Sequence, residues 1–162
     1  MARFEHVLAA LAAVEVRFVV AGGVAVVLHG HPRLTADLDL VVDLAPDQIA
    51  RALDVLTELG LRPAVPVDPH DFADPETRER WIDQRGMTVF SLVSPDDPLH
   101  AVDLFARSPA PFDELWDRAV TVTIADATVR VASIDDLIAM KRTADRPQDR
   151  ADVAALEALR DG

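Results

Sequence analysis

The chain has 162 residues, enough for one hydrophobic core and too few for two ordinary domains, so we expect a single domain over residues 1–162. Half of the residues are hydrophobic and 5% are aromatic, which is typical of a globular α/β protein and excludes a disordered one. The net charge of −12 opposes non-specific binding to DNA or to an anionic membrane. The absence of cysteine excludes disulfides, thiolate zinc sites and cysteine nucleophiles.

Targeting signals are not evident at the start of the chain. The first six residues carry charge where a signal peptide would need an apolar core, and no apolar run approaches 18 residues. We therefore expect a cytoplasmic protein with no membrane partner.

Hydrophobic periodicity predicts three helices and two strands in the first 60 residues: helices over 3–15, 24–29 and 46–60, and strands over 17–21 and 37–43. The first strand breaks at Gly22-Gly23, which predicts a tight turn from strand to helix. Gly60 is the expected cap of the third helix.

The second half of the chain begins with four prolines and many acids between residues 63 and 79, which predict an irregular or mobile segment. Strands are predicted near residues 86–93, 100–105, 120–124 and 128–132. Residues 133–160 are predicted to be helical and part of the same unit, opening at Ser133 with Asp136 three residues later as an acidic capping box. The expected fold is α/β (α+β), a mixed sheet of four to five strands flanked by helices with a helical C-terminus.

Two carboxylates stand on the second predicted strand, at Asp37 and Asp39. Residues two apart on a strand point to the same face, so these like charges would repel one another. A divalent cation between them removes the repulsion, and hard oxygen ligands suit Mg²⁺ or Mn²⁺. The spacing alone proves nothing in so acidic a chain.

The glycine pair has two interpretations. A strand followed by glycines and a helix lets a phosphate approach the backbone and meet unpaired N–H groups. A glycine in such a turn can equally be there for geometry alone.

The composite of these elements is more informative than any one of them. Gly22-Gly23, a short helix and then Asp37-Leu-Asp39-Leu resemble the signature of the nucleotidyltransferase superfamily with the DNA polymerase β-like fold. His29-Gly30 and Arg33-Leu-Thr-Ala-Asp37 look most like the AbiEii-type, minimal bacterial nucleotidyltransferases of toxin–antitoxin and phage-defence systems. The stretches 136–141 and 146–152 match the form of a second motif of that group.

This resemblance implies transfer of a nucleoside monophosphate from an NTP, with attack in line at the α-phosphate and two metal ions held by Asp37, Asp39 and a third carboxylate. Asp103 is our choice for the third, because it is the one acid in the apolar pattern 100–105. The alternative for Asp103 is a solvent-facing position on an edge strand.

Two cations are candidates for nucleotide binding together with Gly22 and Gly23. Arg33 precedes the metal strand and could contact the triphosphate, or it could be a surface residue. Lys141 lies near the apolar stripe of its helix, where an unpaired charge is costly, so we expect it to partner a phosphate or an acid. Asp149 and Asp152 could pair with it or with Arg146, or they could form an exposed acidic face.

Other residues invite weaker interpretations. His29 and His31 are spaced for a capping role and not for a zinc site, because residues two apart on a helix do not face one another. Trp81 and Trp116 are expected to be core or partner-facing anchors.

Several functions remain open at this point. The first is a metal-dependent nucleotidyltransferase of a toxin–antitoxin or defence system, with a partner protein or tRNA as acceptor. The others are a nucleotidyltransferase of the lincosamide or aminoglycoside kind that modifies a small molecule, and a non-catalytic, antitoxin-like binding module with the same fold. The acidic composition makes naked tRNA the harder acceptor.

Overall fold

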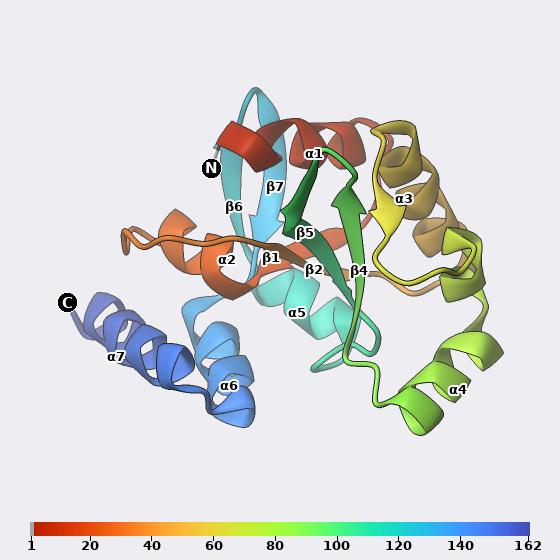
Figure 1. Cartoon of the computed structure of the whole chain (residues 1–162). Coiled ribbons are helices and arrows are strands. Elements are labelled where there is room, and N and C mark those ends of the chain that lie inside the picture. The colour runs from red at the N-terminus through yellow and green to blue at the C-terminus, as the bar shows by residue number, and fades with distance from the viewer. Residues whose placement is uncertain (1) are drawn as a thin grey trace.

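The computed structural model describes residues 2–162, and within them seven strands form one mixed sheet in the order β3-β4-β5-β2-β1-β7-β6 (Figure 1). The strands are β1 (Phe18–Ala21), β2 (Leu38–Val42), β3 (Arg62–Pro63), β4 (Val89–Ser94), β5 (Asp97–Phe105), β6 (Val120–Ile124) and β7 (Ala127–Val131). The helices are α1 (Ala2–Ala13), α2 (Gly22–Leu28), α3 (Pro46–Glu58), the 3₁₀ helix η1 (Pro69–Ala73), α4 (Pro75–Arg85), α5 (Phe112–Arg118), α6 (Ile134–Ala144) and α7 (Pro147–Asp161).

The centre of the sheet is where the chain buries its most apolar strands. Every residue of β1 is buried, as expected of a strand covered on both faces. In β2, Leu38 and Leu40 are fully buried while Asp39 between them points to the opposite face. The sheet thus presents a carboxylate on the face opposite two core leucines.

The predicted α/β fold with a mixed sheet and a helical C-terminus is confirmed, and its strand count is corrected. Six expected strands all lie in one sheet, so four to five strands is an underestimate. The seventh is β3, two residues long, which pairs with β4 at the sheet edge. Two residues are too few for an alternating pattern to be read from sequence.

The segment 63–79 is irregular only in part: residues 64–68 have no regular structure, and η1 and the start of α4 follow them. Pro69 and Pro75 each stand in the first turn of a helix, where a missing N–H costs nothing. Asp68 and Asp74 precede them as caps, accepting hydrogen bonds from the backbone N–H groups of His70 and Thr77. The prolines therefore begin helices here instead of preventing them.

The C-terminal helical region consists of two helices. Ser133 caps α6 as expected, its Oγ accepting from the Asp136 backbone N–H at 3.1 Å. The helix ends at Asp145, which has a left-handed backbone (φ 50°), and Pro147 then starts α7. Figure 1 shows α6 and α7 side by side, at the opposite end of the molecule from α1 and α3. Along residues 2–162, no helix combines the length and apolarity needed to cross a bilayer.

Candidate active site

A line of polar residues crosses three neighbouring strands. In the parallel pairing of β2 with β5, Asp39 stands directly opposite Asp103, and in the antiparallel pairing of β5 with β4, Asp103 stands opposite Ser91. Residues opposite one another in a sheet point to the same face. The Ser91 hydroxyl donates to Asp103 Oδ1 at 2.5 Å. Strand β5 lies between β4 and β2, so the edge-strand alternative for Asp103 is wrong.

Gly22 is the residue that makes room for Asp39. Its φ of +63° is in the left-handed region, and a Cβ placed there would lie 1.9 Å from Asp39 Oδ2. Any side chain at this position would therefore collide with the carboxylate and strain the backbone. Gly22, which directly follows β1, is therefore required by the packing of Asp39 whether or not a phosphate binds.

The carboxylates of the line repel one another. Burial raises the pKa of Asp39 to about 7, and the charges of Asp103 and Asp37 add to the rise, while Lys141 and Arg146 partly oppose it. Burial also raises the pKa of Asp103, against the hydrogen bond from Ser91. Buried carboxylates with raised pKa values that repel one another are common in functional sites.

Asp37 lies just before β2, and its side chain is oriented by β5, the strand that pairs with β2. Its Oδ1 accepts the Ala101 backbone N–H at 2.9 Å, and the Thr35 hydroxyl donates to its backbone carbonyl at 3.2 Å. It acts on Asp39 and Asp103 through its charge. The three predicted acids are thus gathered in one region of the sheet.

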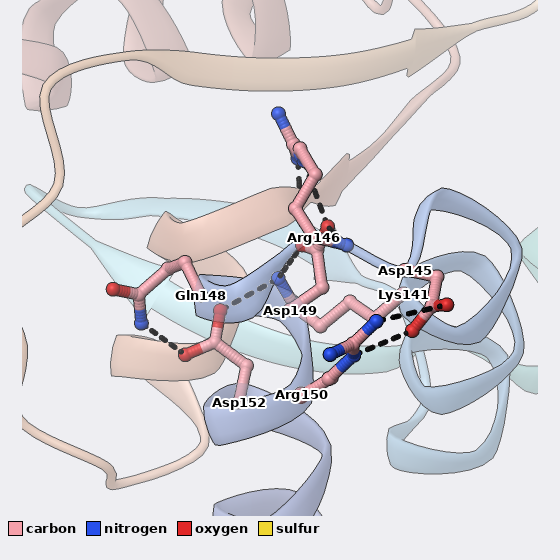
Figure 2. Close-up of polar contacts among 7 residues, drawn as sticks. All are labelled: Lys141, Asp145, Arg146, Gln148, Asp149, Arg150 and Asp152. Carbon is pink, nitrogen blue, oxygen red and sulfur yellow. Dashed lines mark hydrogen bonds and ion pairs between the residues drawn. The ribbon is translucent and has the colours of Figure 1, made fainter.

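Lys141 is buried, with its ammonium among acids of α7. Its Nζ lies 2.8 Å from Asp152 Oδ2 and 3.6 Å from Asp149 Oδ1 (Figure 2). Asp152 is fully buried and Asp149 is 3% exposed, so the alternative of an exposed acidic face is wrong. Lys141 therefore has acid partners, one of the two expectations for it.

Arg33 joins the same network from the loop before β2. Its Nε lies 3.1 Å from Asp152 Oδ1 but is not aligned for a hydrogen bond. A Cβ added at Gly23 would lie 1.9 Å from Nη1 of Arg33, so the second glycine is packed beneath this guanidinium. Arg33 is thus an internal ion-pair partner rather than a surface residue.

Arg146 and Gln148 complete the network. Arg146 was expected as an alternative partner of the two acids, whereas Gln148 had no predicted role. The backbone N–H and Nε of Arg146 both donate to Asp149 Oδ2, at 3.1 and 2.8 Å (Figure 2). These bonds outweigh the burial that would raise the pKa of Asp149 and hold it below its usual value. Gln148 Nε2 donates to Asp152 Oδ1 at 3.2 Å. The spacing of Arg146 and Asp149 across Pro147 is the only signal that could have revealed this arrangement.

A cleft of about 810 Å³ lies between the sheet and α6. Four of the predicted site residues line it, namely Gly22, Asp39, Asp103 and Lys141. The other three, Gly23, Arg33 and Asp37, are not part of its lining. Its size is within the range of small-molecule sites. Roles of these residues in nucleotide binding and catalysis remain predictions.

The donor set fits a hard divalent cation. Within residues 2–162, no three His, Asp or Glu side chains are already spaced as a complete metal site. Mg²⁺, however, is usually bound by one or two carboxylates together with water and substrate phosphates. Asp39 and Asp103 supply two carboxylates on one face, and a cation would relieve their repulsion. These residues therefore fit a divalent cation whose remaining ligands come from water or from a bound molecule.

The histidine and tryptophan expectations can also be placed. His29 Nε2 lies 2.8 Å from the Ala132 carbonyl oxygen, a structural contact between α2 and the segment before α6. Trp81 is buried and stacks on Phe90, as expected of a core residue. Trp116 is half-buried beneath the guanidinium of Arg130, at 4.1 Å from the ring centroid.

A family described as "Nucleotidyl transferase AbiEii toxin, Type IV TA system" matches residues 6–161 of the chain. No curated protein matches the sequence.

Solved nucleotidyltransferase structures share the fold. Lincomycin-bound LnuA, a lincosamide antibiotic adenylyltransferase, has a TM-score of 0.59 at 16% identity, over 98% of this chain and 92% of that one. ANT(2'')-Ia in complex with adenylyl-2''-tobramycin has a TM-score of 0.57 at 17% identity, over 98% and 93%. An antigenic nucleotidyltransferase-like protein from Paracoccidioides brasiliensis has a TM-score of 0.55 at 17% identity, over 96% and 74%. At these identities the likeness is one of fold.

Proposed function

Because the chain belongs to the AbiEii nucleotidyl transferase family, we propose that it moves a nucleoside monophosphate from an NTP to an acceptor in the cleft beside α6, with Mg²⁺ or Mn²⁺. One observation carries this proposal: Asp39 and Asp103 stand in register on adjacent strands and line a cleft of about 810 Å³ that also holds Lys141 and Arg146. Two repelling carboxylates beside two cations suit a substrate that brings both phosphates and a metal.

The reaction is a substitution at the α-phosphorus. The acceptor oxygen forms a bond to phosphorus, the bond to the bridging oxygen of the β-phosphate breaks, and pyrophosphate leaves with the electron pair. Metal held by Asp39 and Asp103 would lower the pKa of the attacking hydroxyl and neutralise charge on the leaving group. The nucleophile and the leaving group lie on opposite sides of the phosphorus.

Asp103 is suited to take the proton of the hydroxyl. It lies beside Asp39 on the adjacent strand, and the Ser91 hydroxyl fixes one of its oxygens. Its other oxygen is the one to face the reacting group. Asp37 contributes negative charge that raises the basicity of both neighbours.

Positive charge for the phosphates comes from α6 and from the start of α7. Lys141 is already neutralised by Asp152 and Asp149, so it holds the wall of the site more than it adds net charge. The Arg146 side chain is 74% exposed and paired to one carboxylate, so it can reorient toward a phosphate at lower cost. We therefore assign the first contact with the triphosphate to Arg146.

The biological role in this proposal is that of a toxin in a toxin–antitoxin or defence system, as the family description suggests. A non-catalytic binding module is disfavoured by the electrostatics. A site without a metal-bound substrate would keep the repulsion of Asp39 and Asp103 with no compensating interaction.

Transfer of label tests the function. The protein is incubated with each α-³²P-NTP, Mg²⁺ or Mn²⁺ and a total lysate, and label is followed into protein, RNA and small molecules. We expect transfer to fall by about 10³-fold in Asp39→Asn and in Asp103→Asn, because the metal ligands and the base are lost. Asp83→Asn on the exposed face of α4 is the matched control. Wild type that neither binds nor consumes any NTP would overturn the proposal.

A further inference from the structure

The cleft has a direction set by the order of the strands. Gly22 follows β1, Asp39 lies on β2 and Asp103 on β5, and β4 comes next. Ala21 is the register partner of Asp39, and Asp39 that of Asp103. A substrate lying across the strands therefore passes from the glycine turn over the two carboxylates to β4.

The two ends of this path differ in charge. Lys141 is bound to Asp152, and Asp152 lies beside Arg33, whose Nη1 occupies the place that a Cβ at Gly23 would take. Arg146 is bound to Asp149 of the same network. Lys141 and Arg146, which both line the cleft, therefore lie at its glycine end. Since this inference rests on the proposed function, the departing pyrophosphate belongs at that end.

The opposite end of the cleft is apolar. Beyond Asp103, apolar lining comes from α4, β4, β5 and the loops before β4 and after β5, namely Ile82, Met87, Val89, Phe105 and Pro109. One cation borders them, Arg107, and its Nη2 is bound to Glu79 Oε2 at 2.6 Å. We call these five side chains the apolar wall.

In-line attack connects the two ends. The nucleophile must approach the α-phosphorus from the side opposite the leaving pyrophosphate, which is the side of the apolar wall. We propose that the acceptor is a small molecule whose hydroxyl is carried on an apolar body, seated against Met87 and Phe105. The hydroxyl forms the new bond to phosphorus, and its proton passes to Asp103.

Two further observations favour a small acceptor of this class over a nucleic acid. RNA binding depends on cations that contact phosphates, and the cation at this end is held by a carboxylate in a protein of net charge −12. The cleft of about 810 Å³ is of the size that small ligands occupy, and Asp39 and Asp103 are part of its lining.

A matched pair of probes tests the acceptor class. Phenethyl β-D-glucoside and methyl β-D-glucoside carry the same sugar hydroxyls and differ in the apolar body. With the NTP that binds best, we expect the phenethyl compound to receive label at least tenfold more efficiently, and to bind the complex with a non-hydrolysable NTP analogue. Met87→Glu should abolish that tenfold preference, Met87→Leu should keep it, and the affinity for NTP should be unchanged in both.

The contrary outcomes separate the two proposals. If Met87→Glu weakens NTP binding as much as transfer, the apolar wall holds the nucleoside and this inference is overturned. It is also overturned if the phenethyl compound neither binds nor accepts label while NTP binds normally, or if total RNA accepts label at lower concentration. Wild type that fails to bind NTP overturns the proposed function itself.

Discussion

Asp39 and Asp152 are aspartates of the same site region with opposite electrostatic situations. Asp152 is fully buried, yet its two oxygens meet Lys141, Arg33 and Gln148. Asp39 is half-buried, and its nearest charged neighbours on the sheet are other carboxylates, which help to raise its pKa to about 7. The first arrangement holds α6 and α7 together, whereas the second is unfavourable until a proton or a cation arrives.

The two aspartates show which charged groups stabilise the fold and which destabilise it. Burying a charge costs free energy unless the charge is paired and hydrogen-bonded, and Lys141, Asp149 and Asp152 of α6 and α7 meet that condition. The line of Asp39 and Asp103 does not meet it, which is usual for groups kept for function. Each prediction below changes one residue of the paired network, of the carboxylate pair or of its surroundings.

Removal of Lys141 should have the largest effect on stability. Lys141→Met leaves Asp152 and Asp149 buried without their ammonium partner, so we expect a loss of about 3–5 kcal/mol in the free energy of unfolding. Urea denaturation followed by circular dichroism measures it. Adding Asp152→Asn to Lys141→Met should recover part of the loss, because the uncompensated charge is then gone. If the single variant Lys141→Met and the double variant with Asp152→Asn were equally stable, the ion pair would not be the source of the loss.

The pH dependence of stability should carry the signature of Asp39. Its pKa is about 7 in the folded protein and 3.8 in the unfolded chain, so the folded state binds the proton more tightly. Stability from this group is therefore complete below pH 3.8 and is lost as pH rises toward and through 7. In chelator the loss should be about 2–4 kcal/mol.

Asp39→Asn is the control for that loss. The amide cannot ionise, so in chelator the melting temperature of this variant should change less between pH 5 and 8 than that of wild type. At pH 8 it should be higher than the wild-type melting temperature. Mg²⁺ or Mn²⁺ should raise the melting temperature of wild type at pH 8 and leave the variant unchanged, because ligands that bind only the folded state stabilise it. Identical pH profiles for the two proteins would assign the titration to another group.

Gly22 should be more sensitive to substitution than a glycine of the same backbone conformation. Gly22 and Gly86 both have φ +63°, but a Cβ at Gly86 meets nothing within 4 Å, whereas one at Gly22 lies 1.9 Å from Asp39 Oδ2. Alanine at Gly86 should cost about 1 kcal/mol for the backbone alone. Alanine at Gly22 should cost about 1–3 kcal/mol more, from the collision. Equal losses in denaturant titration would mean that Asp39 moves aside freely.

Periodicity and topology account for the part of the site that could be predicted. Asp39 alternates with Leu38 and Leu40, and Asp103 interrupts an apolar strand, so each could be assigned to a strand face from sequence alone. The parallel pairing that sets Asp39 opposite Asp103 follows from the fold. The resemblance to a family supplied that fold before any geometry was available.

The remainder depended on contacts between distant positions. The pairing of Lys141 with Asp152 was one of two alternatives, and helical spacing could not decide between them because the two residues are on different helices. Helix α5 has only seven residues, too few for a clear helical period, and α4 was hidden by prolines that begin helices. The packing of Gly23 against Arg33 is likewise a contact between distant positions, and its expected role at the phosphates stays a prediction.

The smallest effect should come from an ion pair that resembles the buried network in sequence alone. Arg150 lies on α7 between Asp149 and Asp152 and donates from Nε to Asp145 Oδ1 at 2.9 Å, but both side chains are largely exposed. Water already solvates these charges, and holding two long side chains in one geometry costs entropy. Arg150→Gln should therefore leave the denaturation midpoint at the wild-type value in low salt and in high salt. A loss like that of Lys141→Met would mean that Asp145 shares the buried network, and that burial is not what separates the two kinds of pair.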